Sequence, residues 1–107
     1  MTEFIQVSTA TDKREEAERI SKAIVENRLA ACVQISGPIT SIYWWKDNLE
    51  EAEEWLLTMK TSKEIYPRLE QAIKNFHPYE VPEIVAVPIM AGSSDYLGWI
   101  KKETGNE

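Results

Sequence analysis

The side chains best suited to chemistry in this sequence are a single histidine and a single cysteine among 107 residues. His77 lies in the stretch FHPYEVPEI (76–84), and Cys32 lies in the apolar stretch LAACVQI. A neutral imidazole and a thiolate both bind transition metals, and Glu80 or Glu83 would add a carboxylate near the histidine. The short spacing within an extended connector does not by itself place these groups in one coordination shell. A metal site and a histidine hydrogen-bonded to backbone at a helix exit therefore both stay open.

Cys32 is predicted to lie in the core. Free cysteines are among the most buried residues, and no basic residue beside Cys32 indicates an activated thiolate. A lone cysteine excludes an intrachain disulfide and a CxxC metal or redox motif. As a copper ligand, Cys32 would need a partner from elsewhere in the fold.

The sequence contains no recognisable catalytic motif. A pair formed by Cys32 and His77 has no evident third group to orient it, and P-loop, nucleophile-elbow and dinucleotide-binding patterns are absent. We therefore predict that the protein is not an enzyme and has no obligatory cofactor. A small hydrolase or transferase that uses His77 as its general base is the weakest alternative.

Two charged stretches have ordinary explanations. An acidic run surrounds a turn signal, and its members are Asp47, Glu50, Glu51, Glu53 and Glu54. Without the regular ligand spacing of a calcium loop, this run is typical of a solvated hairpin tip. Lys60 and Thr61, which precede a helix start, form a weak anion-binding signal.

Composition and charge indicate one soluble globular domain over residues 1–107. Hydrophobic residues make up 43% of the chain and charged residues 28%, with a net charge of −6. Scattered basic residues argue against nucleic-acid binding, and no apolar run is long enough to span a membrane. The first residues do not resemble a signal peptide. We expect a cytoplasmic protein.

Hydrophobic periodicity predicts the order β-α-β-β-α-β followed by a tail helix, which is the ferredoxin-like arrangement of an α+β protein. Asp12 and Ser62 are the expected helix caps, and Pro67 predicts a loose first turn in the second helix. Gly37-Pro38 should interrupt the second strand with a bulge. The expected strands are 4–9, 29–45, 50–61 and 83–89, and the expected helices are 12–27, 62–76 and a short one near 95–102.

The hairpin formed by the second and third strands is too long for one chain to cover. Each arm beyond Gly37-Pro38 exceeds the usual strand length of about five or six residues. Because successive strand residues point to opposite faces, Trp44 and Trp45 cannot both face the same core. Exposed indoles in a patch usually mark an interface, so we predict a homo-oligomer. The alternative is that the tail helix covers the second face.

Five stretches together resemble the CutA divalent-cation-tolerance family: RLAACVQI, SIYWW, MKT, HPYEVPEI and DYLGWI. The similarity runs from about Phe4 to Lys101. It implies a ferredoxin-like subunit in a tight homotrimer whose long hairpins interlock neighbouring subunits. It also implies a role in tolerance to divalent metals, with binding of Cu(II) or another divalent cation and no enzymatic activity.

The resemblance also assigns candidate site residues. Cys32 and His77 match motif positions, and with Glu83 they are the metal-ligand candidates. Tyr43, Trp45, Lys60 and Tyr79 match recurring positions that should gather in a pocket near the subunit boundary.

Three departures from the family pattern bear on metal affinity and on the hairpin turn. Ser8 and Thr9 stand where some members offer a second cysteine, and Phe76 stands where some carry another histidine. The resemblance therefore implies weak rather than tight copper binding. Asp47-Asn48 replaces a frequent glycine in the hairpin turn, and both residues tolerate the turn conformation.

Two functional hypotheses follow. The first is a homotrimeric metal-responsive protein that binds divalent cations weakly near its subunit interfaces. The second is a trimeric regulatory module, resembling PII-like signalling proteins, that binds a small anion between subunits through Lys60 and Thr61. Loss of Cu(II) binding in His77→Ala would favour the first.

Overall fold

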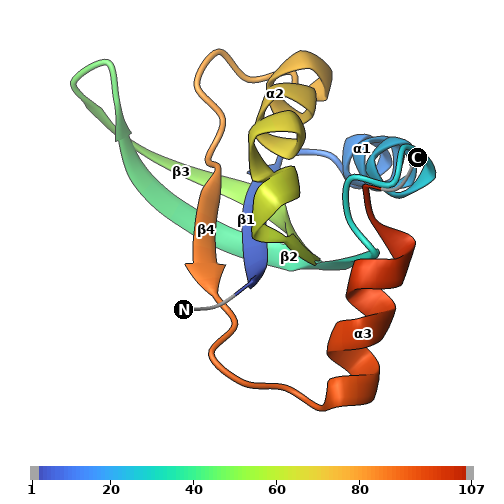
Figure 1. Cartoon of the computed structure of the whole chain (residues 1–107). Helices are drawn as coiled ribbons and strands as arrows, with labels where there is room; N and C mark the ends of the chain where they lie inside the picture. The colour runs from blue at the N-terminus through green and yellow to red at the C-terminus, as the bar shows by residue number, and fades with distance from the viewer. Residues whose placement is uncertain (1–2, 106–107) are drawn as a thin grey trace.

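A computed structural model describes residues 3–105 of the chain (Figure 1). The predicted order of strands and helices is confirmed, with a single 3₁₀ turn, η1 (Lys63–Ile65), before the second helix. The elements are β1 (Phe4–Thr11), α1 (Arg14–Glu26), β2 (Cys32–Trp45), β3 (Asn48–Ser62), α2 (Tyr66–Phe76), β4 (Val85–Pro88) and α3 (Ser94–Glu103). None of the helices in this range is long and apolar enough to cross a membrane.

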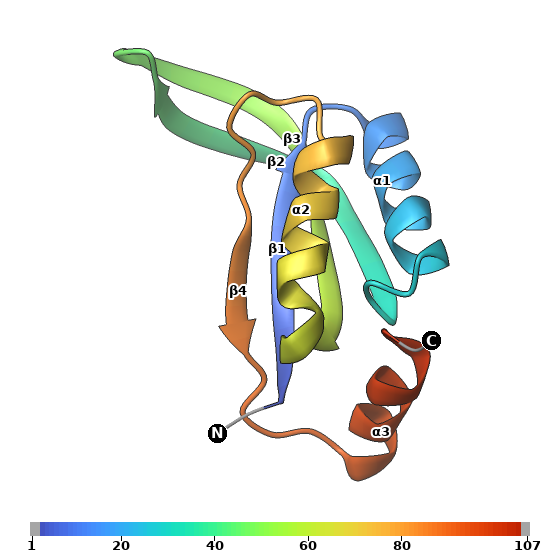
Figure 2. The same cartoon turned by 45° about the horizontal axis from the view of Figure 1, so that its top comes forward.

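The strands form one antiparallel sheet in the order β2-β3-β1-β4. Helices α1 and α2 lie on the same face of this sheet (Figures 1 and 2). This is the ferredoxin-like α+β architecture that the sequence pattern predicts. The opposite face carries neither helix, and Val85 and Val87 on β4 are about half exposed.

The hydrophobic core lies between the sheet and these two helices. Val7 on β1 and Leu57 and Met59 on β3 point toward the helices and are fully buried. Helix α2 presents one apolar stripe to the sheet: Leu69 and Ile73 are buried, and Tyr66 and Phe76 pack at the margin of the core. The apolar residues that alternate along the strands and those that recur at helical spacing therefore pack in one core.

Several element ends differ from the sequence predictions. The N-cap of α1 is Lys13, not Asp12, and it makes no side-chain cap hydrogen bond. Ser62 precedes η1 without capping it, although the expected loose turn before Pro67 is present. Strand β2 begins three residues later than predicted, and β4 is shorter at both ends. These strand ends depend on pairing with distant strands, which local sequence does not show. The N-cap of α3 is Ser93, whose hydroxyl accepts a hydrogen bond from the Tyr96 N–H.

Beyond a bulge, β2 and β3 continue as a projecting hairpin that we call the arm (residues 39–54) (Figure 2). The pairing register shifts between Ser36 and Ile39, as the Gly37-Pro38 break predicts. A Cβ atom at Gly37 would lie 2.6 Å from the Trp55 ring, so glycine permits this close approach. At the tip, Lys46 and Asp47 have positive φ values and form a tight two-residue turn closed by the Trp45–Asn48 pair, one residue earlier than the expected Asp47-Asn48.

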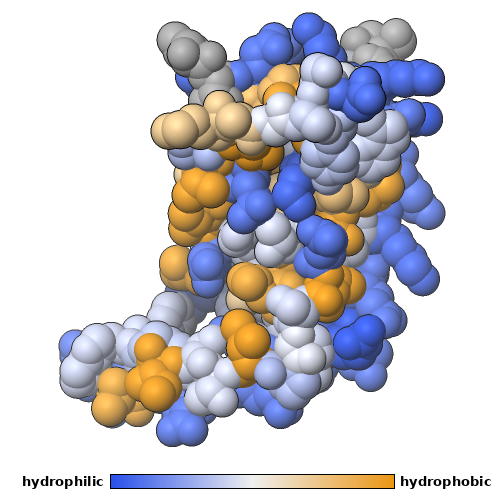
Figure 3. All heavy atoms as spheres, turned by 90° about the horizontal axis from the view of Figure 1, so that it is seen from below, coloured by the Kyte–Doolittle hydropathy of each residue, from blue (hydrophilic) through white to orange (hydrophobic). Residues whose placement is uncertain are grey.

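Large hydrophobic side chains on the arm are exposed on both of its faces. Ile42 (66% exposed), Trp44 (72%) and Leu49 (64%) share one face, because Trp44 pairs directly with Leu49, and Tyr43 (40%) and Trp45 (37%) lie on the other face. Figure 3 shows hydrophobic atoms on the projecting arm as well as on the body of the molecule. The alternative in which the tail helix covers the arm is wrong, because α3 lies near the start of β2, where the Tyr96 hydroxyl is 3.6 Å from Cys32 Sγ.

Candidate functional site

His77 fastens the end of α2 to β1 and is 7% exposed. Its Nε2 lies 2.7 Å from the carbonyl oxygen of Ala10, which can only accept, so Nε2 carries the proton. Its Nδ1 accepts a hydrogen bond from the Tyr79 N–H at 3.1 Å. The imidazole is therefore neutral, and both ring nitrogens have backbone partners. This arrangement is the backbone-bonded histidine at a helix exit, one of the two alternatives that the sequence allows, the other being a metal site.

The histidine joint positions Tyr79 over the base of the arm. The two rings meet edge to face with centroids 4.7 Å apart. The Tyr79 hydroxyl then donates to Glu54 Oε2 at 2.7 Å. Burial, together with the hydrogen bond to the Glu54 carboxylate, raises the pKa of Tyr79 well above its usual range. The connector after α2 is thus held to β1 by His77 and to β3 by Tyr79.

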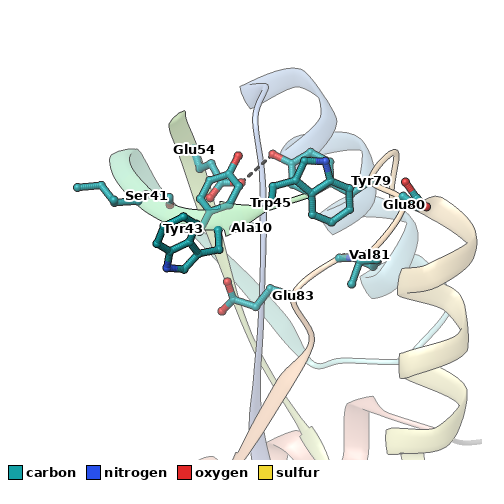
Figure 4. Close-up of a pocket in the computed structure, with 12 residues that line it drawn as sticks. Ala10, Ser41, Tyr43, Trp45, Glu54, Tyr79, Glu80, Val81 and Glu83 are labelled. Atoms are coloured by element: carbon teal, nitrogen blue, oxygen red, sulfur yellow. Dashed lines mark hydrogen bonds between the residues drawn. The ribbon is translucent and has the colours of Figure 1, made fainter. Parts of the chain in front are cut away.

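A pocket of about 780 Å³ opens between the arm and this connector (Figure 4). Three kinds of group form its walls: aromatic rings, aliphatic side chains and carboxylates. Its lining residues are Ala10, Ser41, Ile42, Tyr43, Trp44, Trp45, Glu54, Tyr79, Glu80, Val81, Pro82 and Glu83. A pocket of this volume accommodates a small organic molecule.

The pocket is acidic. Glu54 is buried, with only 7% of its surface exposed, and its carboxylate accepts a hydrogen bond from the Tyr79 hydroxyl. Neither Glu54 nor Glu83 forms an ion pair with a Lys or Arg within residues 3–105. Glu80 has a cationic neighbour at the rim, where Lys46 Nζ lies 3.8 Å from its carboxylate. The site thus favours a positively charged occupant.

The pocket brings together four of the residues that the sequence singled out and leaves out three. Tyr43, Trp45, Tyr79 and Glu83 all line it. His77 lies beneath the pocket as a support, and its prediction as a metal ligand would require one of its two hydrogen bonds to be given up.

Cys32 and Lys60 lie at the other end of the sheet. They face each other across β2 and β3, and Lys60 Nζ donates to Gln34 Oε1 at 2.9 Å. Both align with Gln6 on β1, four positions from Ala10, so Cys32 is on the order of 13 Å along the sheet from the His77 joint. Among the described residues, no group of three His, Cys, Asp or Glu side chains could hold a metal ion. One chain alone does not make the predicted metal site.

Sequence reasoning named Glu54 only as part of a solvated acidic run, and the structure places it in the pocket wall. Its pairing with Ile39 at the base of the arm brings it under Tyr79. The signal that could have found it is an acidic residue flanked by the hydrophobic stretch that begins at Trp55. A charge so close to a buried strand segment needs a partner.

Comparison with known proteins places these features in a family. Residues 5–103 match the family model described as CutA1 divalent ion tolerance protein. The divalent-cation tolerance protein CutA of Thermus thermophilus is 45% identical over 105 residues, which cover 98% of this chain and 100% of that protein. A solved structure of the divalent cation tolerance protein from the same organism has a TM-score of 0.93, 45% identity, and coverage of 95% of this chain and 99% of that one.

Two further relatives show the range of the likeness. The structure of the periplasmic divalent cation tolerance protein CutA from Archaeoglobus fulgidus has a TM-score of 0.90 and 37% identity, and the match covers 94% of this chain and 97% of that one. The mouse Protein CutA is 44% identical over 88 residues, which are 82% of this chain. The match spans 50% of the mouse protein.

Proposed function

The chain belongs to the CutA1 divalent ion tolerance family, and from this premise we propose that it is a cytoplasmic, non-enzymatic homotrimer that binds divalent cations weakly near its subunit interfaces. Cu(II) or another divalent metal ion is the expected ligand, and no cofactor is obligatory. The family supports the link to divalent-cation tolerance.

The observation that carries the proposal is the uncovered arm. On the face of this projecting hairpin that carries Ile42, Trp44 and Leu49, the large hydrophobic side chains stay mostly exposed within residues 3–105. Patches of this kind in soluble proteins are usually interfaces. The unoccupied sheet face beside Val85 and Val87 offers a second apolar surface on the same molecule. A second copy of the chain would cover both.

Metal binding would then depend on the assembly. The described residues of one chain hold no three-ligand group, whereas the pocket presents carboxylates beside the arm. Hard divalent cations prefer such oxygen ligands, and copper would gain from Cys32 or His77 of a neighbouring subunit. A site shared between subunits, with few soft ligands in each, should bind weakly.

The test is Cu(II) titration by calorimetry on the assembled protein, with its mass measured on the same sample. We expect a trimeric mass and saturable binding that weakens in Glu83→Gln and Cys32→Ser. Glu64→Gln, an exposed acidic residue outside the pocket, is the matched control and should bind like the parent protein. A monomeric mass would refute the assembly, and equal binding by all variants would refute the ligand assignment.

His77→Ala answers a separate question. If His77 is a metal ligand, this substitution should abolish Cu(II) binding. If His77 instead holds the connector through its two hydrogen bonds, the substitution should mainly lower the free energy of unfolding. Measuring the unfolding free energy beside the titration separates the two effects.

The anion-binding alternative gains no support from the site. Thr61 is fully buried, and the Lys60 ammonium is engaged by Gln34 on the sheet face. The residues that this hypothesis needs therefore do not converge at the start of the helix.

A further inference from the structure

We infer that the pocket between the arm and the connector binds a small organic cation of the alkylammonium class. The inference goes beyond divalent metals, because it depends on the aromatic walls of the pocket as well as on its carboxylates. It stands on three observations: an aromatic enclosure, a buried carboxylate without a cationic partner, and a lysine of the chain itself held at the rim.

The aromatic enclosure suits an ammonium group attached to carbon. Tyr43 and Trp45 on one face of the arm and Tyr79 on the connector come from two separate segments and line one cavity (Figure 4). The face of an aromatic ring attracts a cation, and several rings together form the cages that recognise alkylated ammonium groups. Val81 and Pro82 add aliphatic surface for the carbon chain. A strongly hydrated metal ion would gain nothing from these walls.

Lys46 already shows this mode of binding at the rim. Its Nζ lies 5.4 Å from the centroid of the Trp45 ring and 3.8 Å from the Glu80 carboxylate. Both distances are those of a cation held by a ring face and an opposite charge. The side chain is an alkylammonium group, and it occupies only the outer edge of the pocket, since 69% of it is exposed. The inner pocket has the same chemistry and no lysine or arginine among its lining residues.

Glu54 supplies the charge at the inner end. Its carboxylate is almost fully buried, and the Tyr79 hydroxyl satisfies one of its oxygens. A buried carboxylate without a cation is costly, so a bound ammonium would stabilise the site that holds it. Glu83 faces the same space from the opposite wall (Figure 4). The ligand would place its ammonium near Glu54 or Glu83 and its carbon atoms against the rings.

The test is calorimetric titration of the native protein with n-butylammonium and tetramethylammonium chlorides, with butan-1-ol as the neutral comparator. We expect saturable binding of the two cations and none of the alcohol. Trp45→Leu and Glu54→Gln should each weaken binding by about tenfold or more, because each removes one of the two attractions. Glu64 lies outside the pocket, so Glu64→Gln should leave the binding of both cations unchanged.

Two variants separate this inference from alternatives. Lys46→Met removes the competing internal ammonium and should tighten binding of n-butylammonium about threefold. Trp45→Leu should spare the binding of Ca²⁺ or Cu(II), because the proposed metal ligands do not include an indole ring, so a parallel loss of metal and ammonium binding would point to a disturbed fold. Circular dichroism of each variant checks that the fold is kept.

Two results would overturn the inference. One is equal heats for butan-1-ol and n-butylammonium, which would reduce the pocket to an apolar cleft. The other is the absence of cation binding by a protein whose mass is trimeric, which would show that a neighbouring copy fills the pocket. The proposed divalent-cation function survives either result, since its own test uses metal ions and the subunit mass.

Discussion

Strand β3 passes through two very different environments. From Trp55 to Ser62 it lies in the body of the sheet, where Leu57 and Met59 are fully buried against α1 and α2. From Asn48 to Glu54 it forms half of the arm, where Leu49 is 64% exposed. The hydrophobic residues of β3 therefore stabilise the subunit in the body of the sheet, whereas on the arm Leu49 stays mostly exposed.

This difference shows how stability and function are divided along one strand. The body holds the fold, and the arm offers surface for association and one wall of the pocket. The His77 and Tyr79 contacts lie where the two regions meet, so they connect the fold to the site. Substitutions in each region should consequently change different measurements.

The largest effect is expected in the body. Leu57→Ala should lower the free energy of unfolding by about 2–5 kcal/mol, because it leaves a cavity in a closely packed core. Urea denaturation monitored by circular dichroism measures it. Leu49→Ala makes the same chemical change on the arm and is the matched control, with an expected change in a single subunit below about 0.5 kcal/mol. Equal losses in both variants would contradict the division.

The next effect is at the joint between body and arm. His77→Ala leaves the Ala10 carbonyl and the Tyr79 N–H without their partners, and we expect a loss of about 2–3 kcal/mol. Asn75→Ala, an exposed change two residues earlier, should cost less than about 0.5 kcal/mol. Unfolding in urea again provides the measurement. A negligible loss in His77→Ala would show that the histidine does not hold the connector.

Tyr79→Phe should lower stability by about 1–2 kcal/mol at pH 7, because the buried Glu54 carboxylate loses its donor. Burial and the Glu54 hydrogen bond raise the pKa of Tyr79 above the 10.0 of an unfolded chain. The folded protein thus keeps this proton above pH 10, where the unfolded chain releases it, so the contribution is complete below pH 10 and declines at higher pH. Unfolding measured at pH 7, 9 and 11 should show the two proteins converging. A difference that stays constant with pH would sink this explanation.

The smallest effect on the stability of a single subunit is expected at the arm. Trp44 is 72% exposed, and Trp44→Ala should change the unfolding free energy of an isolated subunit by less than about 0.5 kcal/mol. Under the proposed trimer, the same change should weaken association, since buried tryptophans contribute strongly to interfaces. Sedimentation velocity over a range of concentrations measures this, with Val25→Ala on α1 as an exposed hydrophobic control. Unchanged association would remove the arm from the interface.

Local sequence was sufficient for most of the fold. The alternation in β3 and the helical stripe of Leu69 and Ile73 each depend on neighbours in the chain, so the pattern of residues predicts them. A turn at the tip of the arm was predicted as well, but it lies at Lys46-Asp47 and not at Asp47-Asn48. The Gly37-Pro38 bulge follows from the same kind of local constraint. Element ends were less predictable, because the start of β2 and the length of β4 depend on pairing with distant strands.

The sequence by itself determined the family, the order of the elements and the extended connector that carries His77. Only the tertiary structure decided what that connector does. It brings the histidine ring to the Ala10 carbonyl and Tyr79 to Glu54, across 67 and 25 positions of the chain. The tertiary structure also separates Cys32 from His77. It encloses a pocket that includes Glu54, which belongs to an acidic run that the sequence predicts to be solvated. Contacts between residues so far apart are set by strand register and helix packing, which no short stretch of sequence contains.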